Sequence, residues 1–260
     1  MRVRVLLPLL LLDTLALADP HPPLVIFSVE NDLDGASGSA MGLLPLACYD
    51  PTRGVVSGGA GCLVLLPTRA KVATADGTLR TSGPRRVVCA LNGKKLPGIG
   101  VTDRSAARVN GRLAMWPRFE VRSLARREPS AVDVAALRTL VADARGDHPA
   151  HERLVVIGWS GDLDGDGVEV RLWAVAIGRG YDDEGTRVGA LVLARGTAPP
   201  VILVRETGTA FDLAGVVDLD GDGHVELVIT RALFEGSKTS VERVNGDRLE
   251  RIGGGAYCGT

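Results

Sequence analysis

The sequence predicts a mainly β protein of antiparallel meander sheets, with one short linking helix. Asp-Gly and Asn-Gly pairs recur between β-prone segments. Such pairs form the tight type I′ turns of β-hairpins, because both central residues need positive φ. Short apolar runs rich in β-branched residues follow later in the chain, as is typical of strands. A single stretch between these two regions shows helical spacing instead.

The start of the chain, residues 1–18, has the pattern of a secretory signal peptide. Two arginines precede a mostly apolar stretch from Val5 to Ala18, and small residues at 16 and 18 fit a cleavage site. A transmembrane anchor is the alternative, but Pro8 and Asp13 interrupt the run, and an anchor needs about 18 clean apolar residues. We therefore expect a secreted or periplasmic protein that starts at Asp19 and is not inserted in a membrane.

Residues 19–128 are expected to form an N-terminal β domain. The turn signals there are Asp76-Gly77, Asn92-Gly93 and Asn110-Gly111. Their spacing is that of an antiparallel meander, extending from about residue 48 to about residue 125.

The four cysteines of the chain are predicted to form two disulfide bonds. An even count in an exported protein favours disulfides, although buried free thiols are the alternative. Sequence alone leaves three pairings open. No two cysteines have C-x-x-C spacing, which argues against a zinc site and against dithiol redox chemistry. The cysteines are Cys48, Cys62, Cys89 and Cys258.

The stretch "SAVDVAALRTLVADARG" predicts a helix over residues 131–145. Ser130 followed by Asp133 is a variant of the capping box. Apolar residues then recur at helical spacing as far as Ala144, and Gly146 is a plausible stop. We expect residues 129–150 to be a helical joint between two β regions.

After this joint, residues 151–260 contain a series of short apolar runs that predict strands. The runs are Leu154–Ile157, Val170–Ile177, Ala190–Ala194, Val201–Val204, Gly215–Val217 and Leu227–Thr230, and a further hairpin turn is expected at Asn245-Gly246.

The hexapeptide "DLDGDG" occurs twice among these strands, at Asp162–Gly167 and at Asp218–Gly223. Crowded carboxylates repel one another and disfavour a compact loop, and a divalent cation removes that penalty. Calcium accepts several oxygen ligands in flexible geometry, and glycine at the sixth position allows the sharp bend that its loops need. Both segments are therefore predicted calcium sites, and a pair of acidic turns without metal is the alternative.

The residues that follow each hexapeptide argue against an EF-hand. It needs a bidentate Glu at the twelfth position and helices on both sides. The twelfth residues are Trp173 and Ile229, and both lie in β-like runs.

Each loop, with the strand after it, resembles the FG-GAP and VCBS repeats of integrin-type β-propellers, over residues 153–255. The resemblance implies propeller-like or partial-propeller sheets and calcium as the cofactor. It also implies ligands at positions one, three and five, a carbonyl at seven and an acid at nine. These are Asp218, Asp220, Asp222, the His224 carbonyl and Glu226 in the second copy, and Asp162, Asp164, Asp166 and the Val168 carbonyl in the first.

The first copy departs from this pattern at the ninth position, which is Val170. Glu169 is adjacent, but alternation along a strand would direct it to the opposite face. We therefore expect the Asp218 loop to bind calcium more tightly than the Asp162 loop.

The functional expectation is an exported, calcium-stabilised, non-catalytic module that is structural or binds a protein or glycan at the cell surface. A net charge of −1 gives no electrostatic case for nucleic acid. "GWSGD" at Gly158 fails the G-x-S-x-G pattern because Asp162 takes the last glycine position. The alternative is a secreted hydrolase with chemistry in residues 19–128 and the repeats as an accessory.

Overall fold

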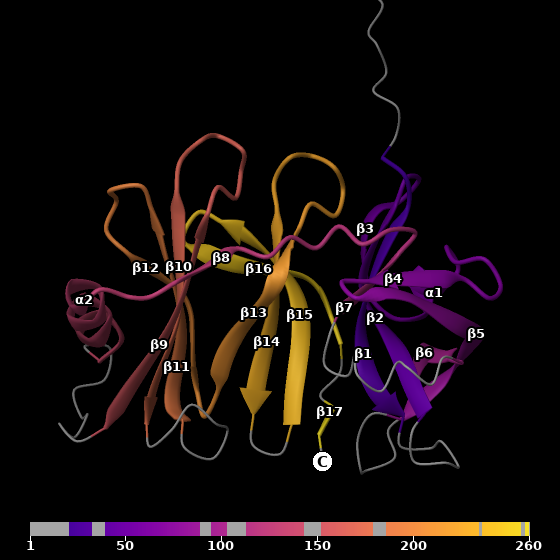
Figure 1. Cartoon of the computed structure of the whole chain (residues 1–260), viewed down its shortest axis with the longest axis horizontal. Coiled ribbons are helices and arrows are strands. Elements are labelled where there is room, and N and C mark those ends of the chain that lie inside the picture. The colour runs from indigo at the N-terminus through magenta and orange to yellow at the C-terminus, as the bar shows by residue number, and fades with distance from the viewer. Residues whose placement is uncertain are drawn as a thin grey trace, which may run out of the picture.

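The computed structural model describes residues 21–32, 40–88, 95–102, 113–142, 152–178, 186–233, 236–255 and 258–259. It confirms a mainly β fold of antiparallel sheets. The elements form four layers, from the helix α2 through two sheets to a barrel (Figure 1). The predicted signal peptide lies outside the described residues and stays a prediction. None of the helices described is long and apolar enough to cross a membrane.

The barrel is a closed antiparallel sheet of six strands in the order β1-β7-β4-β5-β6-β2, in which β1 also pairs with β2. The short strand β3 (Gly54–Ser57) pairs with the C-terminal part of β2. A tight turn joins β4 to β5 where Asp76-Gly77 predicts one, but the predicted type I′ form is wrong: Thr74 pairs with Gly77, so the central residues are Ala75 and Asp76, and neither has positive φ. The other two turn signals of this region lie outside the described residues. The barrel strands are β1 (Leu24–Asp32), β2 (Ala40–Asp50), β4 (Lys71–Thr74), β5 (Gly77–Val88), β6 (Lys95–Val101) and β7 (Leu113–Trp116).

Strand β1 is buried on both faces, which explains its nearly continuous apolar sequence. Val25, Phe27 and Val29 point into the barrel core, while Leu24 and Ile26 point outward to the neighbouring sheet. The barrel therefore has one apolar face on its outside as well as an apolar interior.

One predicted disulfide is confirmed, between Cys48 of β2 and Cys62 of the one-turn helix α1 (Ala60–Leu63), with Cα atoms 5.6 Å apart. It ties this helix to the barrel, where both cysteines belong to the buried core. Cys89 and the side chain of Cys258 lie outside the described part of the chain, so their pairing stays a prediction.

Two meanders make up the C-terminal half, and every strand predicted there is present. We call the first the outer sheet, with the order β12-β11-β10-β9-β8, and the second the central sheet, with the order β13-β14-β15-β16 and β17 also on β15. The outer-sheet strands are β8 (Ala125–Arg127), β9 (Arg153–Gly161), β10 (Val170–Gly178), β11 (Thr186–Arg195) and β12 (Val201–Thr207). The central-sheet strands are β13 (Ala210–Val217), β14 (Glu226–Leu233), β15 (Gly236–Asn245), β16 (Arg248–Gly254) and β17 (Cys258–Gly259).

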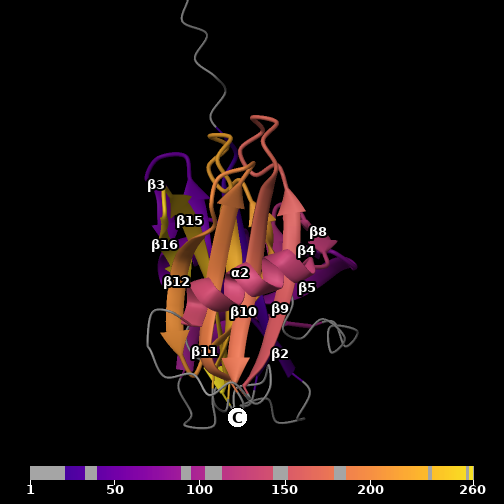
Figure 2. The same ribbon diagram turned by 90° about the vertical axis from the view of Figure 1, so that its left-hand side faces the viewer.

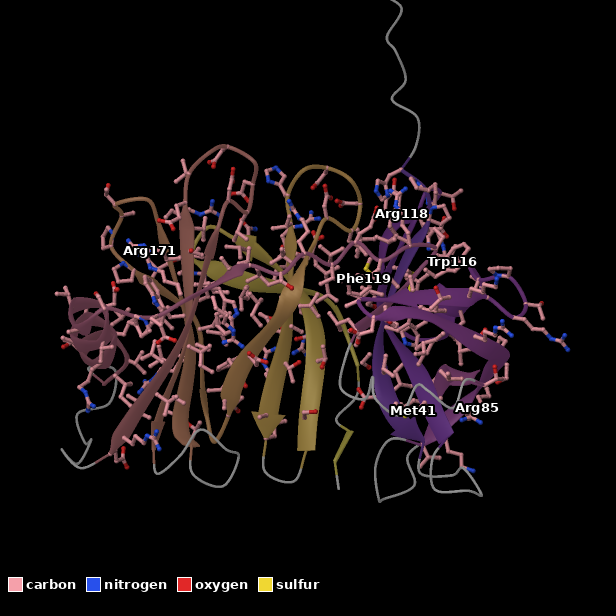
Figure 3. All side chains as sticks on the ribbon, in the orientation of Figure 1. Met41, Arg85, Trp116, Arg118, Phe119 and Arg171 are labelled. Carbon is pink, nitrogen blue, oxygen red and sulfur yellow. A yellow bond between two sulfur atoms is a disulfide. The ribbon has the colours of Figure 1, made fainter. Side chains whose placement is uncertain are left out.

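The layers are joined by two shared apolar cores. Leu172 and Leu191 of the outer sheet pack against Phe211 and Leu227 of the central sheet. The opposite face of the central sheet packs on the outside of the barrel through residues that include Val217, Val228, Leu24 and Ile26. Phe119, labelled in Figure 3, is partly buried in this second core. The two meanders thus stack face to face, and the barrel packs on the other face of the central sheet.

Helix α2 (Ala131–Ala142) begins at the predicted capping box, since Ser130 Oγ accepts the Asp133 N–H at 3.1 Å and Asp133 Oδ2 accepts the Ser130 N–H at 3.0 Å. Leu137 and Val141 pack on the outer sheet, so the helix covers that sheet's free face (Figure 2). Arg171, labelled in Figure 3, lies 3.9 Å from the Asp133 carboxylate.

The helix therefore does not lie between the two β regions, and the crossing is made by the chain before it. Arg122 exchanges backbone hydrogen bonds of 2.8 and 2.9 Å with Val216 of β13. The same segment then forms β8, which pairs with β9. Residues 117–130 thus connect the first strands of the two meanders.

Candidate metal centre

The two DLDGDG segments occupy the same position in their sheets. The Asp162 loop connects β9 to β10, and the Asp218 loop connects β13 to β14. The consecutive strands of the two meanders are β9–β12 and β13–β16, with β8 added at the edge of the first. Each loop thus follows the first strand of its meander, and both project from the same end of the molecule (Figure 1).

The loops share one internal hydrogen-bond pattern. In the second loop the Asp218 carboxylate accepts the N–H groups of Gly221 at 2.8 Å and Gly223 at 3.1 Å, and Asp222 Oδ1 accepts the His224 N–H at 2.8 Å. The same three bonds occur in the first loop, where the distances are 2.8, 2.9 and 2.8 Å and the groups are Asp162 to Gly165, Asp162 to Gly167, and Asp166 to Val168.

The sixth-position glycines have the conformation that the sequence predicts. Gly167 has φ of 80° and Gly223 has φ of 87°. This left-handed region is costly for residues with a Cβ atom, and it produces the sharp bend that turns the chain back into the next strand.

The second loop gathers its carboxylates around one point. Oxygens of Asp218, Asp220 and Asp222 lie within 4.8 Å of one another. Among the described residues, this is the only cluster of three or more Asp, Glu, His or Cys side chains that could hold a metal ion. Asp220 Oδ1 is buried and has no hydrogen-bond donor. A buried carboxylate oxygen without a partner is unfavourable, and a cation would satisfy it. The residues present therefore fit a hard cation that prefers oxygen ligands.

Glu226, the predicted ninth-position ligand, is fully buried beside this cluster. Its Oε2 accepts the Leu219 N–H at 2.9 Å, and its Oε1 accepts Arg243 Nε–H at 2.7 Å. Burial raises the pKa of Glu226, and the bonds from Leu219 and Arg243 offset part of that rise. The Glu226 carboxylate thus holds the loop by accepting the backbone N–H of Leu219. Its role as a metal ligand stays a prediction, as do the carbonyl ligands at His224 and Val168.

No sequence pattern points to Arg243, which reaches the cluster from β15. Its guanidinium lies 2.9 Å from Asp220 Oδ2 and 3.6 Å from Asp222 Oδ2. Burial raises the pKa of Asp220, but the hydrogen bond and charge of Arg243, together with hydrogen bonding from Asp222, outweigh it and leave the pKa lowered. The side chain reaches the site because Arg243 is the cross-strand partner of Glu226, a relation that only the strand register reveals.

The first loop has different neighbours. Its ninth residue, Val170, is buried in the core between the two sheets. Glu169 is exposed and pairs with Arg127 at 3.2 Å, so it points away from the loop as the alternation predicts. Asp164 pairs with Arg195 of β11. Among the described residues, the three aspartates of this loop do not bring their oxygens close enough together to share a metal.

Comparison with known proteins adds no relative: no protein-family model, curated protein or solved structure matches the chain. Three clustered aspartates do not by themselves identify FG-GAP repeats. The geometry of the loops is therefore the main support for any function.

Proposed function

We propose that this protein is an exported, calcium-stabilised, non-catalytic module with a structural or binding role. The observation that carries the proposal is the cluster of Asp218, Asp220 and Asp222, whose oxygens lie within 4.8 Å of one another. One of these oxygens, Asp220 Oδ1, is buried and has no donor. A divalent cation would neutralise the cluster and provide this oxygen with a partner.

Calcium is the cation that the donors favour. The cluster offers carboxylate oxygens, with the His224 carbonyl and Glu226 as further proposed ligands. Calcium binds such oxygen sets with variable geometry, whereas magnesium demands a near-ideal octahedron and zinc favours nitrogen and sulfur.

The loop's position explains how calcium would stabilise the whole module. Leu219, within the loop, is buried in the core between the central sheet and the barrel. Val225, at its end, is buried in the core between the two sheets. Ordering the loop therefore fixes side chains in both cores, so a metal bound here would strengthen the junction of three layers.

We also propose that the two meanders are repeats of the FG-GAP and VCBS type. Support comes from the position of each loop between the first two strands of a meander and from the identical hydrogen bonds in both. The Cys48–Cys62 disulfide supports export, because disulfides persist mainly in oxidising compartments.

Calcium titration by calorimetry and thermal unfolding tests the proposal. Extracellular sites often bind at about 10⁻⁴–10⁻³ M, so about 1 mM calcium should add about 0.4–1.4 kcal/mol per site. Asp220→Ala should abolish the tighter binding event, and Asp164→Ala should leave it. Asp247→Ala, at an exposed hairpin turn, is the control for loss of an aspartate from the same sheet.

An unchanged melting curve between chelator and calcium, with protein shown to be metal-free beforehand, would refute the proposal. Loss of the tighter event in Asp164→Ala instead would move the main site to the first loop.

A further inference from the structure

Each acidic loop receives an arginine from the third strand of its meander. Arg195 of β11 is the cross-strand partner of Val170, and Arg243 of β15 is the partner of Glu226. Val170 and Glu226 are the ninth residues of their loops. The two arginines therefore occupy equivalent positions, although the connections that precede them differ in length.

The arginines also make equivalent contacts. Arg195 pairs with the third-position aspartate of its loop, Asp164. Arg243 pairs with the third-position aspartate of the second loop, Asp220, at 2.9 Å. Arg243 additionally contacts Glu226, at 2.7 Å from Nε to Oε1. A guanidinium close to the carboxylates thus recurs in both copies of the repeat.

We propose that Arg243 is the internal counter-cation of the Asp218 loop: it holds the acidic side chains when no metal is bound, and it is displaced from Glu226 when calcium binds. This inference rests on the proposed calcium site. Arg195 has the same holding role at Asp164, in a loop whose ninth residue offers no carboxylate for a metal to recruit.

Two features of the contacts make arginine and metal compete at Glu226. Oε2 of Glu226 is bonded to the Leu219 amide and Oε1 to Arg243, so a metal that approaches Oε1 has to compete with the guanidinium. A divalent cation among the same carboxylates would also repel the guanidinium, because like charges a few ångströms apart interact strongly away from bulk water.

Asp220 provides the route for this exchange. Its Oδ2 is bonded to Arg243, while Oδ1 is buried without a donor. Calcium can therefore bind Oδ1 first and compete for Glu226 afterwards. The loop stays folded in both states, so calcium binding exchanges one cation for another rather than ordering a collapsed loop.

The experiment compares the wild-type protein with Arg243→Gln and Arg243→Lys, by calcium calorimetry and by thermal unfolding in chelator. Arg243→Gln removes the competing charge, so calcium should bind about tenfold more tightly, within the usual range of coupling between two sites. In chelator the same variant should melt several degrees below wild type, because the loop loses its counter-cation. Arg243→Lys keeps the charge but loses the forked hydrogen bonds. Its calcium affinity and its melting temperature in chelator should lie between those of wild type and Arg243→Gln.

Arg248→Gln is the control for loss of one positive charge from the same sheet, since its side chain is 87% exposed; it should match wild type in both measurements. Unchanged or weaker calcium binding in Arg243→Gln would overturn the exchange and make Arg243 a fixed support of the ligands. If Arg243→Gln does not fold, Arg243→Lys provides the test instead. The exchange then requires that Arg243→Lys bind calcium more tightly than wild type.

Failure of the proposed function gives a separate result. Calcium binding by Arg243→Gln but not by wild type would support the counter-cation and refute calcium stabilisation of the natural protein. No calcium binding by either protein would overturn the exchange together with the calcium site.

Discussion

The Asp162 and Asp218 loops have the same hexapeptide, the same internal hydrogen bonds and the same glycine conformations, yet only the second gathers three carboxylates. The difference lies in the layer that each loop faces. Val170 belongs to the outer sheet and packs into the apolar core against the central sheet. Glu226, at the equivalent place in the central sheet, is buried beside Arg243. Loop conformation is thus encoded within the loop, whereas metal competence depends on its neighbours.

A second difference is the cover over each loop. A Cβ atom added to Gly221 would lie 2.3 Å from Cδ2 of His21, while one added to Gly165 would have nothing within 4 Å. His21 in turn packs edge-on against Tyr49 of β2, with ring centroids 5.5 Å apart. The second loop is therefore in contact with the start of the described chain, and the first is open on that side.

The largest effect is expected from Glu226→Gln, measured as the free energy of unfolding in chelator. The change leaves the Arg243 guanidinium facing an amide and weakens the bond to Leu219. Breaking a buried charge pair from one side is strongly destabilising. Because the Arg243 side chain is 28% exposed and keeps Asp220, we expect a smaller loss, about 2–4 kcal/mol.

Glu169→Gln is the matched control in the first loop. Glu169 is one residue before the ninth position, exposed, and paired only at the surface with Arg127. Its substitution should change the unfolding free energy by no more than about 0.5 kcal/mol. Equal effects of the two variants would contradict the assignment of Glu226 as the buried support of its loop.

The sequence predicts the parts of this arrangement that are local. The acidic hexapeptides, the glycine bends, the β15–β16 hairpin and the capping box at Ser130 each depend on residues close in the chain, and the structure contains all of them. The hairpin turn is centred on Gly246 and Asp247, however, because Asn245 pairs with Arg248 in the strands. The β-branched runs likewise form strands. Their preference for a strand needs only apolar neighbours in the sheet, whichever strands supply them.

The remaining features depend on register and on contacts between distant segments. No short-range sequence pattern predicts the closure of β1 on β2 or the packing of α2 on the outer sheet. Arg195 and Arg243 look like ordinary strand-end residues until the pairing places each opposite a ninth loop position. An equal spacing from the loops would have been a signal, but the two connections differ in length.

An intermediate effect is expected from alanine at the fourth loop position. Gly165 has φ of 70° and Gly221 has φ of 74°, so both substitutions should cost about 1 kcal/mol of backbone strain. Gly221→Ala must also displace His21, and loss of its contact with Tyr49 should add about 0.5–1.5 kcal/mol. Urea unfolding of both variants measures the difference.

His21→Ala separates the two contributions in a double-mutant cycle. In that background, Gly221→Ala and Gly165→Ala should have equal effects. A difference that persists without His21 would mean that the two loops are not conformationally equivalent.

The smallest difference is expected from Asp218→Ala and Asp162→Ala in the presence of chelator. Each change removes a carboxylate that accepts two glycine N–H groups, at 2.8 and 3.1 Å for Asp218 and at 2.8 and 2.9 Å for Asp162. Capping bonds of this kind contribute about 0.5–2 kcal/mol, and in the second loop relief of repulsion between the gathered carboxylates offsets a small part of the loss. Without metal the two variants should therefore agree within about 0.5 kcal/mol, the limit of additivity for separate sites. With calcium they should diverge, because only Asp218→Ala removes a ligand of the proposed tighter site. A clear difference already present in chelator would show that the surroundings, and not the hexapeptide, set the conformation of each loop.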